Sequence, residues 1–272
     1  MQLLRSIFIV MLFFSWSFAS EHYTVGIVPQ MQTTEIQSSW VPFLTELSKQ
    51  TGVEFEIKYY ATIPLFEKGL KNGEVDVAFM NPYHAVMAYD WKQYKPIIHD
   101  KKPLVGILVV KKESPIRSIK ELDKKSVAFP SPNAFAASLI MRALLKEDEK
   151  ISITPVYVKT HSNVYRNVLF GLYPAGGGVN NTLSRENIGI SSGLRVLYTT
   201  KPTASHPLCV SANMPQATVL KIRDTILKMG NNPAFKEMLN NIQVPNPVVA
   251  DYKTEYLPLK KLKLEDYIVT EN

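Results

Sequence analysis

Apolar residues in the first third of the chain follow two alternating patterns. Short runs rich in β-branched and aromatic residues predict strands at 23–28, 53–60 and 75–79. Between these runs, apolar residues recur at helical spacing, as they do from 40 to 47, so each gap is predicted to hold a helix. The run at 75–79 is almost wholly apolar, which is typical of a strand buried on both faces of a parallel sheet.

A second β-α-β series begins after a strongly apolar strand predicted at 104–111. Strands are predicted at 126–129 and 153–158, with a helix over 134–146 between them. The short apolar run at 208–212 is predicted to bring the chain back to the first series. Residues 244–272 carry little pattern, and no element is assigned to them.

The two series predict an α/β protein of two lobes, each a mostly parallel sheet flanked by helices. We expect the first lobe to comprise residues 20–108 and 208–272, with residues 109–207 inserted as the second lobe.

The N-terminal 19 residues have the pattern of a signal peptide. Arg5 precedes an apolar run at 7–14, and Ser17-Phe18-Ala19 offers small residues for cleavage after Ala19. The alternative, a membrane anchor, is disfavoured because the apolar run is short for a membrane-spanning helix. No cysteine follows the run, so a lipid anchor is not supported. We therefore expect an exported, soluble periplasmic protein.

Composition and charge narrow the function further. Hydrophobic residues make up 46% of the 272 residues and the net charge is +7, but the lysines are scattered, so nucleic acid is not an expected partner. The chain has no nucleophile elbow, P-loop or Cys/His metal spacing, so neither catalysis nor a metal or cofactor is expected. The single cysteine, Cys209, lies in an apolar run and is expected to be a buried structural thiol.

Two segments resemble a known family. The first reads Gly73-Glu74-Val75-Asp76-Val77-Ala78-Phe79-Met80-Asn81-Pro82, and is similar to the G-x-V-D-x-A-F-x-x-P segment of periplasmic phosphate/phosphite/phosphonate-type solute-binding proteins of ABC transporters. The second, Ser114 to Leu122, is similar to the S-x-I-x-S-I-x-D/E-L segment of solute-binding proteins, which follows the strand that crosses between lobes. The resemblance covers roughly residues 23–242. It implies a type II-like two-lobed fold that closes on its ligand by a hinge.

Candidate ligand-binding residues follow the predicted strands, because open α/β sheets bind ligands at the carboxyl ends of their strands. They are Asn81, Tyr83, His84, Ser131, Asn133, Phe135, Thr160, His161, Ser162 and Asn180. Ser131, Asn133 and Phe135 lie at the start of one predicted helix, and Thr160, His161 and Ser162 lie at the start of the next. The free N–H groups at a helix start suit an anion. His84 and His161 stand at such edges in opposite lobes. We favour ligand contact for His161, and a half-exposed loop position for His84.

The resemblance is incomplete at two places. Where the family has a hydroxyl-rich S-T-S-G segment, this chain has Ser131 followed by Asn133, Ala134 and Phe135. Asn180 and its neighbour Asn181 stand where aminophosphonate binders tend to carry acids. The first difference removes hydroxyl donors, and the second leaves the site without carboxylates that could pair with an amino group. Both argue against an ordinary phosphonate as ligand.

A run of three glycines occupies the place of the buried strand in the second lobe, at 173–179. Bare backbone allows close approach by a ligand or by another segment. Loose packing of small residues against a helix is an equal alternative. Pro174 stands where the family usually has an aspartate, and it could begin the strand.

The sequence thus predicts a monomeric periplasmic protein that captures a small anionic solute between its lobes. Its partner is either an ABC permease, to which it delivers the solute, or the periplasmic domain of a sensor kinase or chemoreceptor. An exported enzyme that uses His161 or Cys209 is the least favoured alternative, because neither has a visible catalytic partner.

Overall fold

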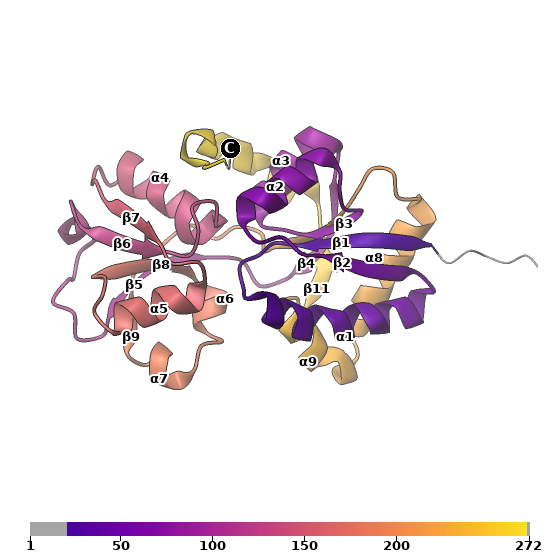
Figure 1. Cartoon of the computed structure of the whole chain (residues 1–272), viewed down its shortest axis with the longest axis horizontal. Coiled ribbons are helices and arrows are strands. Elements are labelled where there is room, and N and C mark those ends of the chain that lie inside the picture. Colours follow the sequence, from indigo (N-terminus) through magenta and orange to yellow (C-terminus); the bar gives the residue numbers. More distant parts are fainter. Residues whose placement is uncertain (1–20, 271–272) are drawn as a thin grey trace, which may run out of the picture.

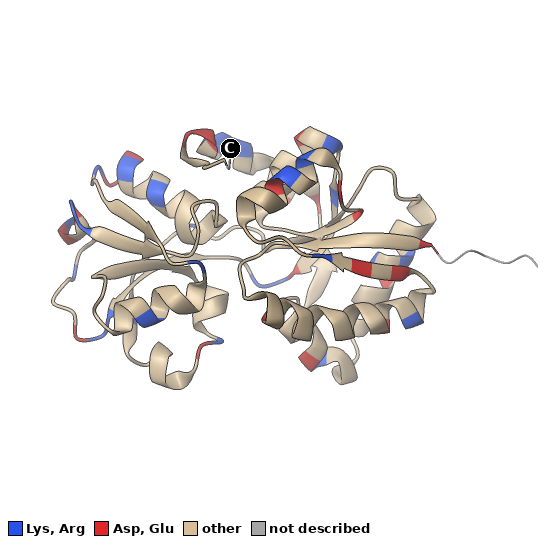
Figure 2. Ribbon diagram, in the orientation of Figure 1, with Lys and Arg blue, Asp and Glu red and all other residues tan. Residues whose placement is uncertain are grey.

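Two α/β lobes lie side by side in the computed structural model of the protein, which describes residues 21–270 (Figure 1). The expected signal peptide at 1–19 lies outside the described residues. Within the described range, no helix is long and apolar enough to cross a membrane. Lysines and arginines are distributed over both lobes rather than gathered in one stretch of the fold, as the sequence predicted (Figure 2).

The first lobe contains a six-stranded sheet in the order β11-β4-β10-β3-β1-β2. Its strands are β1 (His22–Ile27), β2 (Glu54–Lys58), β3 (Val77–Phe79), β4 (Lys95–Asp100), β10 (Pro207–Val210) and β11 (Pro247–Val249). The predicted parallel pairing is confirmed for β1 with β2 and β3. β10 enters antiparallel between β3 and β4, and β11 adds an antiparallel edge to β4, so the sheet is mixed.

Five α-helices accompany this sheet in the described part of the chain. They are α1 (Thr33–Thr51), α2 (Ile63–Asn72), α3 (Pro82–Lys92), α8 (Gln216–Gly230) and α9 (Lys236–Asn241). The predicted apolar face of α1 is buried, with the Trp40 ring 4.9 Å from the ring of Phe79 on β3. Asn81 begins α3 because its side chain accepts a hydrogen bond from the His84 N–H.

The second lobe contains a five-stranded sheet in the order β7-β6-β8-β5-β9. Its strands are β5 (Gly106–Lys111), β6 (Ser126–Phe129), β7 (Thr154–Tyr157), β8 (Ala175–Val179) and β9 (Leu194–Thr199). Its helices are α4 (Ile140–Glu147), α5 (His161–Leu169), α6 (Asn180–Leu183) and α7 (Ile188–Ser191). The helix predicted over 134–146 begins instead as a π-helical turn, Phe135–Leu139, because the Ala134 carbonyl accepts from both Ser138 and Leu139.

Two short segments, 101–105 and 200–206, connect the lobes. They are paired to each other, since the Leu104 N–H donates to the Thr203 carbonyl at 2.9 Å and the reverse bond is 3.0 Å. All of β5 pairs within the second sheet. Asn180 holds the first segment, because its side chain accepts from the Val105 N–H and donates to the Pro103 carbonyl, both at 3.2 Å.

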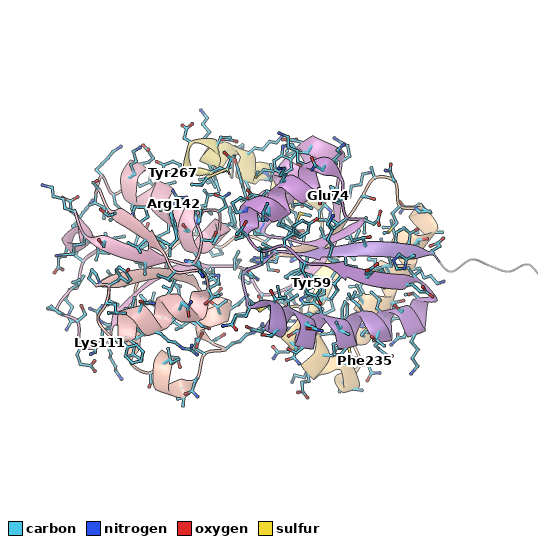
Figure 3. The ribbon with its side chains drawn as sticks, viewed as in Figure 1. Tyr59, Glu74, Lys111, Arg142, Phe235 and Tyr267 are labelled. Carbon is cyan, nitrogen blue, oxygen red and sulfur yellow. The ribbon has the colours of Figure 1, made fainter. Side chains whose placement is uncertain are left out.

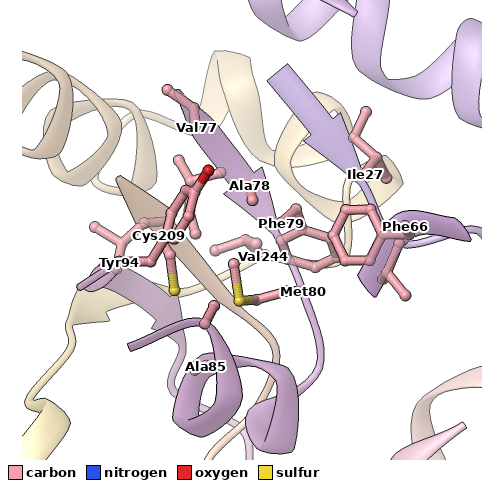
Figure 4. Close-up of a cluster of buried hydrophobic side chains, with 14 of the residues drawn as sticks. Ile27, Phe66, Val77, Ala78, Phe79, Met80, Ala85, Tyr94, Cys209 and Val244 are labelled. Carbon is pink, nitrogen blue, oxygen red and sulfur yellow. The ribbon is translucent and has the colours of Figure 1, made fainter. Parts of the chain in front are cut away.

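The core of the first lobe surrounds β3. Figure 4 shows the side chains of Phe79, Met80, Tyr94 and Cys209 packed together beside α3. Cys209 is fully buried, and burial raises the pKa of its thiol well above the ordinary value. The prediction of a buried thiol is therefore confirmed.

The glycines of β8 allow another segment to approach closely, which decides between the two alternatives. A Cβ atom on Gly177 would lie 2.1 Å from the Ala137 carbonyl oxygen, and one on Gly178 would lie 2.3 Å from the Tyr165 hydroxyl. The π-helical turn and α5 thus pack directly on bare backbone. The turn is set close to the sheet, at the side that faces the first lobe.

Candidate functional site

Segments from both lobes meet at a small cavity between them. It is lined by Val28 after β1, Asn81 before α3, Phe135 in the π-helical turn, His161 at the start of α5 and His206 in the second connecting segment. Its volume is about 10 Å³, so it has room for about one water molecule. The structure thus brings together three of the segments in which the sequence placed candidate residues, represented by Asn81, Phe135 and His161. Asn180 is not among the lining residues of this cavity.

Two histidines face this cavity as neutral groups. His161 is 5% exposed, and burial lowers its pKa to about 4. Its Nδ1 atom has no hydrogen-bond partner among the described residues. Burial, with smaller electrostatic contributions from the nearby His84 and His161 rings, lowers the pKa of His206 to about 3. Neither ring therefore contributes a positive charge near neutral pH.

The start of the π-helical turn contributes backbone donors. Ala136 and Ala137 line the cavity, and first-turn N–H groups of a helix have no acceptor within the helix. Ser131 lies one turn earlier and half-buried, where its carbonyl accepts from the Ala134 N–H at 3.3 Å. It does not line this cavity.

A buried polar network lies beside the cavity and spans the lobes. The His84 Nε2 atom is 2.9 Å from Glu67 Oε1, and Asn133 Nδ2 donates to Glu67 Oε2 at 2.8 Å. Asn81 Nδ2 donates to the Asn133 carbonyl at 3.3 Å. The expected half-exposed position of His84 is wrong: it is 1% exposed, because Glu67 and Phe66 on α2 cover its ring.

Glu67 was missed by the sequence reasoning, although a signal was present. It stands in the apolar stripe of α2, one residue after Phe66 and three before Leu70, where a charged residue implies a buried partner. That partner could not be named from the stripe alone.

Tyr83 and Phe135 form an aromatic contact between the lobes. Their rings are nearly parallel, with centroids 6.1 Å apart and an interplanar angle of 8°. The Tyr83 hydroxyl donates to Glu265 Oε1 at 2.7 Å, and burial raises the pKa of the phenol. Tyr83 is thus directed toward the C-terminal segment.

A larger and more polar cleft of about 160 Å³ adjoins His161. Both lobes line it, with hydroxyls, side-chain amides and three charged groups; its lining includes Gln30, Glu35, Thr160, Ser162, Arg185 and Glu186. Thr160 also begins α5 by accepting from the Asn163 N–H at 3.2 Å. The Ser162 hydroxyl donates to the Glu186 carboxylate.

The charges of this cleft act on one another. Burial raises the pKa of Glu35, the Glu186 carboxylate raises it further, and the Arg185 guanidinium opposes both. The sequence reasoning missed these three residues. Gln30 was missed as well, although it could have been found, since it lies two residues after the first predicted strand, 23–28. Among residues 21–270, no group of three or more His, Cys, Asp or Glu side chains is placed to hold a metal ion.

Two lobes that each carry their own sheet, joined by two segments beside a shared cavity, define a bilobal solute-binding protein of the periplasmic type. A family described as "ABC transporter, phosphonate, periplasmic substrate-binding protein" matches residues 25–256. The chain belongs to this family, whose members bind substrates for transport and are not enzymes.

Similar proteins support the fold and the family. The phosphonates-binding periplasmic protein of Escherichia coli strain K12 is 22% identical over 254 residues, which covers 88% of this chain and 75% of that protein. PhnD1 of Prochlorococcus marinus, solved in complex with methylphosphonate, superposes with a TM-score of 0.81 at 16% identity and covers 91% of this chain and 99% of its own. A binding protein of a Pseudomonas aeruginosa ABC phosphonate transporter has a TM-score of 0.78 at 18% identity, with coverages of 90% and 86%.

Proposed function

We propose that this protein captures a small anionic solute between its lobes by hinge closure and delivers it to the permease of an ABC transporter of the phosphonate/phosphite type. The observation that carries the proposal is the convergence of two helix starts, at Phe135 and His161, on one cavity between the lobes. Helix N-termini attract anions through free N–H groups and the helix dipole.

The size of the cavity supports a closing mechanism. A volume of about 10 Å³ is too small for a tetrahedral oxyanion, so a solute enters only when the lobes separate. The paired connecting segments, 101–105 and 200–206, are the natural hinge. The bonds of Asn180 to the first of them would transmit movement of β8 to that hinge.

The donors at the cavity support an anion other than an ordinary phosphonate. Both histidines are neutral, and the Asn133 amide group is already bonded to Glu67 and to the Val269 carbonyl. The Asn81 side-chain amide is likewise bonded, to the His84 ring and to the Asn133 carbonyl. Backbone N–H groups and the His161 ring, whose Nδ1 atom has no partner among the described residues, are left as the donors for the solute. An anion of low charge or with a planar shape fits such a site better than a dianion that needs many donors.

A ligand panel tests this proposal. Thermal shifts with phosphate, phosphite, methylphosphonate, aminoethylphosphonate, sulfur oxyanions and carboxylates, followed by calorimetry, would identify the ligand class. A His161→Ala variant should bind any hit roughly ten- to hundredfold more weakly, since it loses a donor worth about 1–3 kcal/mol. His22→Ala, at an exposed site on β1, is the control. Unchanged affinity in the His161→Ala variant would refute the location, and micromolar binding of a phosphonate would refute the ligand class.

We also propose export with cleavage after Ala19, and a monomeric state. N-terminal sequencing of protein from the periplasmic fraction should find Ser20 first, whereas intact Met1 in the membrane fraction would contradict export. Light scattering of the purified mature chain should give the mass of one copy.

A further inference from the structure

The C-terminal segment crosses from one lobe to the other. After β11 the chain passes through short helical turns at Leu257–Leu262 and Leu264–Tyr267 and continues to residue 270. In Figure 1 this segment, in yellow, lies over the space between α3 and α4. It begins where the family match ends, at residue 256. We call residues 257–270 the strap, and we propose that the strap joins the lobes and sets how readily the cleft opens.

One part of the strap is anchored on the first lobe. Lys260 Nζ lies 2.7 Å from the carboxylate of Asp90 on α3, and Glu265 accepts a hydrogen bond from Tyr83 at 2.7 Å. The Leu259 side chain is buried, and its turn packs on α3 of the same lobe. These contacts would persist if the lobes moved apart.

The next part of the strap grips α4 in the second lobe. The Arg142 guanidinium donates to the Tyr267 carbonyl at 2.7 Å, and the Tyr267 hydroxyl donates to Glu147 at 2.6 Å. The Tyr267 ring also lies 5.9 Å from the Arg142 guanidinium and 5.6 Å from Lys146 Nζ, both cation–π distances. Figure 3 shows Arg142 and Tyr267 next to each other at this junction.

The end of the strap reaches the candidate site itself. The Val269 N–H donates to Asn133 Oδ1 at 2.9 Å, and Asn133 Nδ2 donates back to the Val269 carbonyl at 2.8 Å. The same Asn133 amide donates to Glu67 on the first lobe. Arg142 donates to the neighbouring Pro132 carbonyl at 2.8 Å. The loop that precedes the π-helical turn is therefore held by the strap and the first lobe together.

Opening the cleft must break the contacts on one side of the strap. The anchor on the first lobe includes the buried Leu259, whereas the grip on the second lobe consists mainly of hydrogen bonds and ring contacts, several of them at partly exposed sites. The second-lobe grip is therefore the part that would release. Loss of several such bonds together should shift the opening equilibrium at least tenfold toward the open form.

A shortened chain tests the strap without any solute, so the result is independent of the proposed ligand. The mature protein ending at Asp266 keeps the first-lobe anchor and lacks Tyr267 and Val269, and a chain ending at Thr270 is the matched control. Hydrogen exchange of the 131–138 backbone should be at least tenfold faster in the shorter chain. Small-angle scattering should show it to be more extended, while the control matches the full chain.

Exchange and scattering identical to those of the control, in a shortened chain with native circular dichroism, would overturn the proposal. If the shortened chain does not fold, the full-length Tyr267→Ala variant decides, because it removes the grip on Glu147 and the cation–π contacts while leaving the backbone in place. Faster exchange at 131–138 in that variant supports the strap, and unchanged exchange refutes it.

Discussion

Lowering the pH should destabilise the folded protein through His161, and the structure sets the size of the effect. Burial lowers the pKa of this histidine from 6.5 to about 4. Between these two values the unfolded chain binds a proton that the folded chain does not, so the free energy of unfolding falls as the pH falls. The contribution of His161 is fully present above pH 6.5 and is lost toward pH 4.

The expected loss between pH 7 and pH 5 is about 2 kcal/mol for this residue alone. Urea denaturation of the mature chain at both pH values measures it. A His161→Gln variant has no titrating ring at this position, so its stability should fall by about 2 kcal/mol less than that of the wild type over the same interval. His206 and the carboxylates titrate in both proteins and cancel in the comparison.

His22→Gln controls for the loss of a histidine in general, because His22 is exposed on β1. Its free energy of unfolding should fall between pH 7 and pH 5 by the same amount as that of the wild type. Equal pH dependence in the wild type and in His161→Gln would refute the reasoning, whatever the absolute stability of the variant. Such a result would mean that His161 is protonated or hydrated in the folded protein.

Two further predictions concern the packing. Gly177→Ala should lower the free energy of unfolding by about 1–3 kcal/mol or more, because its Cβ would meet the Ala137 carbonyl oxygen at 2.1 Å. Gly189→Ala, exposed on α7, should cause no loss, and equal urea midpoints for the two variants would contradict the account of β8. Cys209 should react with a maleimide only after denaturation, since the thiol is buried and its pKa raised; rapid labelling of the folded protein would show that the core opens.

Local patterns in the sequence determined most of the first lobe and the order of elements in the second. Helical spacing on α1 identified the face that buries Trp40, and the apolar run ending at Phe79 identified the central strand. Asn81 could be placed at a strand end because a strand and a helix follow each other directly along the chain. Such features depend on neighbours within a few residues, which is why periodicity and capping reveal them.

The site depended on contacts that the sequence does not encode locally. Asn133 was chosen as a ligand donor, but its amide is bonded to Glu67 and Val269, which lie 66 and 136 residues away. The strap has little periodicity, because its short helical turns are held by side chains of α3 and α4 rather than by an apolar stripe of its own. Only the approach of the two lobes decides which polar groups are buried and paired, and which remain to meet a solute.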